Sequence, residues 1–132
     1  MTAVRSEVCC CGSDASYDRC CGPYHAGAVA PTAEALMRSR YSAYVLAFSD
    51  YLLDTWAAST RPERMAIDAG CTWLGLSVRR SEKLTPDEAT VEFIARYKVN
   101  GRAFRLHEVS RFRREHERWF YVDGFFPEPA AR

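Results

Sequence analysis

The spacing of apolar residues changes once along the chain, near residue 70. Between residues 36 and 48 the apolar side chains recur at intervals of three and four, which predicts an amphipathic helix. Thr32 is the predicted N-cap, and Glu34 lies in the first turn, where a negative charge interacts favourably with the helix dipole. A second helical segment is predicted to begin at Ser49 or Asp50.

Beyond Cys71 the apolar residues alternate with polar ones, which is typical of strands with one buried face. Four strands are predicted, at about residues 72–80, 89–98, 103–114 and 118–126. The Asn100-Gly101 pair between two of them is a strong hairpin signal. Helices followed by an antiparallel meander predict an α+β domain, with the helices packed on one face of a curved sheet.

The first 31 residues show neither period and are rich in cysteine, because five of the six cysteines lie within the first 21 residues. So short a segment cannot bury a core of its own and needs a metal or a disulfide. No export signal is apparent at the N-terminus, so a reducing cytoplasmic location is expected, and clustered cysteines there are typical of metal ligands. We therefore predict a metal-binding head at residues 1–31 and an α+β domain at residues 32–132.

The direction of the side chains selects the metal ligands. In an extended backbone alternate side chains point the same way, so Cys9 and Cys11 converge while Cys10 points away. Eight residues then form a loop that returns to Cys20 and Cys21. Four thiolates satisfy the closed tetrahedral site that is usual for structural Zn²⁺. Cys10 and His25 remain alternative ligands.

The charge balance gives little reason to expect a nucleic acid or membrane partner. The 132 residues carry 18 Lys and Arg against 17 Asp and Glu. No apolar run approaches the roughly 18 residues of a membrane-spanning helix. Arg105, Arg111 and Arg113 alternate on one predicted strand face and leave RNA or ribosome contact as a minor alternative.

A curved sheet covered by helices leaves a concavity, and such pockets commonly bind small molecules. Glu108 is predicted on an apolar strand face, and arginines of the first helix are its expected partners. Trp119, Tyr121 and Asp123 are predicted to share one face of the last strand. Glu108 and Asp123 are the candidate acid/base groups, although a structural ion pair is the commoner role for a buried carboxylate. The predicted pocket residues are Arg38, Arg40, Tyr44, Glu108 and Tyr121.

The cysteine segment at residues 9–22 reads CCCGSDASYDRCCG and resembles the SEC-C zinc motif. That motif has Cys-x-Cys, eight residues, and then Cys-Cys or Cys-His, and it occurs in several bacterial proteins, including the translocase ATPase SecA. Cys10 stands where proline is usual, and Asp14 where glycine is usual. The matching positions are both cysteine pairs, Gly12, Ser13, Tyr17 and Gly22.

Several further segments resemble the YchJ-type bacterial proteins. They are residues 22–25, 31–44 and 119–124, together with the LHE run at 106–108 and the positions after it. This similarity covers nearly the whole chain. It implies a cone-shaped domain of the nuclear-transport-factor-2 (NTF2) type behind an N-terminal zinc motif, and it implies no particular reaction.

The sequence shows no catalytic constellation, so we interpret the chain as a binding protein rather than an enzyme. The leading hypothesis is an adaptor whose zinc head contacts an unidentified protein, with a small-molecule ligand in the cone of the α+β domain. The alternative is a hydratase-, isomerase- or hydrolase-type enzyme that uses Glu108 or Asp123 as acid/base, which rests on fold analogy. Chelation of the metal is expected to disorder residues 9–25 and leave the rest folded.

Overall fold

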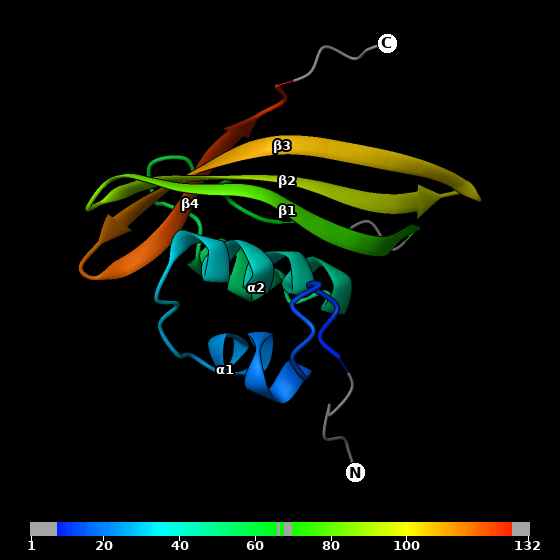
Figure 1. Cartoon of the computed structure of the whole chain (residues 1–132), viewed down its shortest axis with the longest axis horizontal. Coiled ribbons are helices and arrows are strands. Elements are labelled where there is room, and N and C mark those ends of the chain that lie inside the picture. Colours follow the sequence, from blue (N-terminus) through cyan, green and yellow to red (C-terminus); the bar gives the residue numbers. More distant parts are fainter. Residues whose placement is uncertain (1–7, 66, 68–69, 128–132) are drawn as a thin grey trace.

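The computed structural model describes residues 8–65, 67 and 70–127. Within these residues it is an α+β fold in which helices cover one face of a curved antiparallel sheet, as predicted (Figure 1). No helix of the described residues combines the length and the apolar character needed to cross a bilayer. The elements in chain order are η1 (Tyr17–Arg19), α1 (Cys21–His25), α2 (Ala33–Leu46), α3 (Ser49–Asp54), β1 (Cys71–Thr85), β2 (Glu88–Val99), β3 (Arg102–Glu115) and β4 (Arg118–Phe125).

Helix α2 has the ends that its sequence favours. The Thr32 side chain accepts a hydrogen bond from the Ala35 amide at 3.0 Å, which confirms the predicted N-cap. The helix ends at Leu46, and its C-cap residue Ala47 has a left-handed backbone with φ of 64°. Helix α3 then begins at Ser49, as predicted. The short link between the two helices holds α3 beside α2.

The sheet is a simple meander with the strand order β1-β2-β3-β4, and every neighbouring pair is antiparallel. Asn100 and Gly101 have φ angles of 52° and 79° and form the predicted tight turn between β2 and β3. His116 and Glu117, at 52° and 69°, form a similar turn between β3 and β4. Two left-handed residues give a turn whose twist matches that of the strands it joins.

One continuous core joins the cysteine head to the helix and the sheet. Helix α2 lies between the sheet and α1, so the α1 part of the head is stacked on the far side of α2 (Figure 1). Cys11 and Cys21 are fully buried in this core. The core residues that they join include Leu36, Met37 and Tyr41 of α2 and Val91, Phe93 and Phe112 of the sheet. The head therefore shares its apolar contacts with the domain and has no separate core.

Candidate metal centre and cavity

Four cysteines of the head converge on one point. The sulfur atoms of Cys9, Cys11, Cys20 and Cys21 all lie within 4.8 Å of one another. The Cys11–Cys20 and Cys20–Cys21 sulfur separations are 3.5 and 3.9 Å. Zn–S bonds of about 2.3 Å in a tetrahedron place the sulfurs about 3.8 Å apart. The spacing and the donor atoms therefore fit a single ion of this kind, and Cys10 is exposed and outside the group.

The loop between the two cysteine pairs is closed by its own backbone. The Cys9 amide donates to the Ala15 carbonyl at 2.7 Å, and Val8 and Ser16 form an isolated antiparallel bridge. Gly12 has a φ of 86°, a conformation that favours glycine. A Cβ atom at Gly12 would also lie 2.9 Å from the Leu76 carbonyl oxygen of β1. Glycine therefore lets the loop pack directly against the first strand.

Hydrogen bonds within the cysteine cluster favour the ionised form of one thiol, that of Cys11. Hydrogen bonds from Cys21, Ser13 and Cys20 lower the pKa of Cys11 despite its burial. The thiol of Cys21 keeps its proton to donate to Cys11, so its pKa is raised, and burial raises the pKa of Cys20. A thiolate that is already stabilised among thiols is the ligand form that a metal requires, and metal binding would release the remaining protons.

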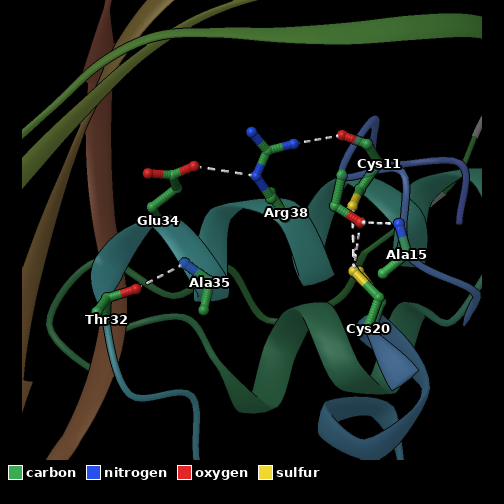
Figure 2. A network of polar contacts seen from close by, with 9 residues as sticks. Cys11, Ala15, Cys20, Thr32, Glu34, Ala35 and Arg38 are labelled. Atoms are coloured by element: carbon green, nitrogen blue, oxygen red, sulfur yellow. Dashed lines mark hydrogen bonds and ion pairs between the residues drawn. The ribbon is translucent and has the colours of Figure 1, made fainter. Parts of the chain in front are cut away.

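Arg38 does not line the cavity, contrary to the sequence prediction. Its Nε donates to Glu34 at 3.1 Å, and its Nη1 donates to the backbone carbonyl of Cys11 at 2.7 Å (Figure 2). Positions two apart on a helix point to different sides, so Arg38 and Arg40 cannot both face the sheet from one helix. Arg38 instead ties the cysteine loop to α2.

His25 is packed at the junction of α1 and α2. Its Nδ1 accepts from the Tyr17 hydroxyl at 2.6 Å, and its Nε2 donates to the Ser39 carbonyl at 2.8 Å. The rings of Phe48 and Tyr51 contact it edge to face. Burial lowers the pKa of His25. With both ring nitrogens engaged in these hydrogen bonds, His25 packs between the helices and stands outside the group of four cysteines.

A cavity of about 220 Å³ lies between α2 and the sheet. Four of the five predicted pocket residues, Arg40, Tyr44, Glu108 and Tyr121, line it. Sequence reasoning left Ser110 and Trp73 out of the pocket, although Ser110 stands two residues from Glu108 on the same strand face. The other residues of the wall are Met37, Tyr41, Phe93, Ala95, Leu106 and Phe112.

Arg40 is a buried cation at the cavity wall, with 5% of its surface exposed. Its Nη1 donates to the Leu52 carbonyl at 2.8 Å and to the Thr55 hydroxyl at 2.6 Å. The guanidinium also lies over the rings of Tyr121 and Trp56, at 4.6 and 5.2 Å from the centroids. Within the described part of the chain, no carboxylate lies within 4.0 Å of this guanidinium.

Glu108 is held in the same cavity by two hydroxyl groups. Its Oε2 accepts from Ser110 at 2.8 Å and from Tyr121 at 3.4 Å. Its side chain lies over Gly124 of β4, where an added Cβ would be 2.9 Å from the Glu108 Cγ and would overlap the carboxylate. Sequence reasoning missed this role, and the one available signal was a glycine inside a strand, which often marks a close approach.

Asp123 lies on the opposite face of the sheet, outside the cavity. Phe112 pairs with Tyr121 whereas Arg111 pairs with Asp123, so β4 contains a bulge between these pairs. The extra residue reverses the alternation, and Asp123 therefore does not share the face of Tyr121 as predicted. Arg111 instead donates to both carboxylate oxygens of Asp123, at 2.6 and 2.7 Å. This pair lowers the pKa of Asp123.

Residues 32–124 match the family model described as YchJ, middle NTF2-like domain. This chain belongs to the YchJ family. A UPF0225 protein of Cupriavidus metallidurans is 56% identical over 92% of this chain and 91% of its own length. A UPF0225 protein of Xanthomonas oryzae pv. oryzae is 51% identical over 93% of this chain and 98% of its own length.

Two solved structures share the fold and carry the SEC-C description. The solution structure of a SEC-C motif containing protein from Rhodopseudomonas palustris is 37% identical, with a TM-score of 0.82, covering 91% of this chain and 98% of that one. The crystal structure of a SEC-C motif containing protein from Psychrobacter arcticus is 30% identical, with a TM-score of 0.73, covering 99% of this chain and 80% of that one. These findings confirm the family, the α+β NTF2-like fold and the SEC-C character predicted from the sequence.

Proposed function

We propose that this protein is a zinc-stabilised binding protein whose NTF2-like cavity binds a small molecule. The observation that carries this proposal is the meeting of a buried cation, Arg40, and a positioned carboxylate, Glu108, in one cavity with apolar walls. Apolar pockets with a few convergent polar groups are the usual form of ligand sites. A groove of about 330 Å³ elsewhere on the surface is larger, but its charged residues, Asp54 and Arg118, are both exposed.

In this proposal Cys9, Cys11, Cys20 and Cys21 hold one Zn²⁺. Four protein thiolates leave no position for water or substrate, so the ion would supply structure and no chemistry. A reducing cytoplasmic location, which the sequence predicts, would keep the thiols available. Metal analysis should find about one zinc per chain in the purified protein, lost in Cys20→Ser and retained in Cys10→Ser. A zinc-free protein, or zinc loss in Cys10→Ser alone, would contradict this ligand set.

A substitution that fills the cavity tests whether a small molecule binds there. Ala95 is 1% exposed and lines the cavity from β2, so Ala95→Phe would occupy its volume. Ala103→Phe adds the same ring at an exposed position of β3 and is the matched control. Native mass spectrometry of the purified protein should detect a bound small molecule with wild type and with Ala103→Phe, and none with Ala95→Phe. A molecule that is retained by Ala95→Phe would place the ligand elsewhere.

A second candidate function is a protein contact through the head, as the sequence suggested. It is supported by the 330 Å³ groove, which is lined by residues 26–30 beside α1 and by Trp119 and Phe120 of β4. Val29, at its edge, is 46% exposed. Affinity purification with wild type and Val29→Asp, which leaves the cysteines intact, separates this contact from any effect of the metal. Identical partner lists from the two proteins would refute it.

A further inference from the structure

We propose that the ligand of the cavity is a small zwitterion: an amino acid with an apolar side chain, its carboxylate on Arg40 and its ammonium on Glu108. This inference rests on the proposed function, because it assumes that the cavity is a ligand site. It adds the chemical class of the ligand and the orientation in which the ligand binds.

The Arg40 end of the cavity is a site for an anion. A guanidinium has five N–H donors, and Nη1 uses both of its own on Leu52 and Thr55. Among the described residues, no acceptor is within hydrogen-bonding range of Nε or Nη2. These two nitrogens form one edge of the guanidinium, and this edge matches the two oxygens of a carboxylate. The side chain is 95% buried and anchored at its other edge, so its position is fixed before a ligand arrives.

The Glu108 end is a site for a hydrogen-bond donor. Oε2 is engaged by Ser110 and Tyr121, whereas Oε1 has no donor within range among the described residues. The absence of a Cβ at Gly124 gives this carboxylate its place above β4. Tyr121 connects the two ends, because its ring lies under the Arg40 guanidinium and its hydroxyl contacts Glu108. The two opposite charges therefore face one cavity without contacting each other.

Charge balance decides between a zwitterion and a simple acid or amine. The cavity carries one cation and one anion, so an acid alone would bring a second negative charge close to Glu108, and an amine alone would bring a second positive charge close to Arg40. A zwitterion satisfies both charges. Its apolar side chain would contact Trp73, Phe93 and Phe112. The 220 Å³ volume is below the ~300–1,000 Å³ of drug-sized sites, which favours a ligand of metabolite size.

Calorimetric titration of the zinc-loaded protein with three probes tests the assignment. L-Phenylalanine carries both charges, 3-phenylpropionate lacks the ammonium, and 2-phenylethylamine lacks the carboxylate. We expect the two single-charge probes to bind at least about tenfold more weakly, because each leaves one charged group of the cavity without its partner. Equal affinity for all three probes would overturn the zwitterion and leave a cavity that binds small apolar molecules. A third outcome is that no probe binds, but a co-purified molecule of another class is present in wild type and lost in Ala95→Phe. The zwitterion inference then fails, and the proposed function stands. If no ligand is detected at all, both fail.

Variants identify which end of the cavity binds the ligand's carboxylate and which end binds its ammonium. Glu108→Gln keeps the side-chain shape, and it should weaken L-phenylalanine about tenfold or more while leaving 3-phenylpropionate unchanged or tighter. Arg40→Lys keeps the positive charge but lacks the paired nitrogens of the guanidinium edge. It should lower the affinity for both probes that carry a carboxylate and leave the affinity for 2-phenylethylamine unchanged. Asp123→Asn neutralises a carboxylate outside the cavity and should change none of the affinities. If Arg40→Lys does not fold, Glu108→Gln still decides, because an equal loss for all probes would show a structural role and refute the assignment.

Discussion

Gly124→Ala tests the contact between Glu108 and β4. An added Cβ would overlap the Glu108 carboxylate, so the side chain must leave its position above β4. It would then lose the 2.8 Å hydrogen bond from Ser110 and the longer one from Tyr121. One good hydrogen bond to a charged group contributes about 1.5–3 kcal/mol, and the 3.4 Å contact adds little, so we expect a destabilisation of about 2–3 kcal/mol. For a domain of this size that corresponds to a Tm lower by roughly 6–12 °C.

The matched control is the same substitution in a Glu108→Ala background. The carboxylate is then absent, and alanine within a strand is favoured over glycine by about 0.5–1 kcal/mol. Gly124→Ala should therefore be neutral or slightly stabilising in that background. Urea unfolding of wild type, both single variants and the double variant gives the coupling free energy, expected at about 2–4 kcal/mol. If Gly124→Ala costs the same in both backgrounds, within about 0.5 kcal/mol, the contact does not explain the glycine.

Three further predictions concern the head and its junction with α2. Removing the metal with a chelator should reduce hydrogen-exchange protection in α2 as well as in residues 9–25, because the cysteines share their core with α2 and the sheet. Unchanged protection of α2 would contradict this and would mean that the head unfolds alone. Arg38→Met should lower the free energy of unfolding by about 1–2 kcal/mol through the lost hydrogen bond to Cys11, and unfolding midpoints equal to wild type would contradict this. Burial lowers the pKa of His25 in the folded state. The ordinary pKa of histidine is about 6.5, so as the pH falls through this value the unfolded state takes up a proton that the folded state does not. Wild type should therefore lose stability as the pH falls from 7.5 to 5.5 more steeply than His25→Gln does, whereas parallel urea midpoints for the two proteins would refute the assignment.

The strand and helix assignments could be made from the sequence because they depend on near neighbours. The three- and four-residue spacing of α2 and its N-cap at Thr32 were predicted and are present. The turn at Asn100-Gly101 was also predicted, because few residues adopt two left-handed conformations in succession. The grouping of Cys9 with Cys11, and the exclusion of Cys10, followed from the alternation of side chains in an extended backbone.

The errors have two different origins. Asp123 was placed on the face of Tyr121 because a regular period of two was assumed, and the bulge in β4 overturned that assumption. A bulge arises from the register of β4 against β3, which no local pattern encodes. Arg38 and Arg40 were grouped by residue type, although their spacing of two turns them to different sides of the helix.

The sequence by itself determined the α+β class, the meander and the grouping of four cysteines, since each follows from the backbone geometry of residues close together in the chain. The tertiary structure alone decided that Arg40, from a helix, and Glu108, from the third strand, face one cavity. It also decided that Gly124 leaves space for the Glu108 carboxylate. These relations join residues far apart in the chain, and they are fixed only when the strand register and the packing of α2 on the sheet are set.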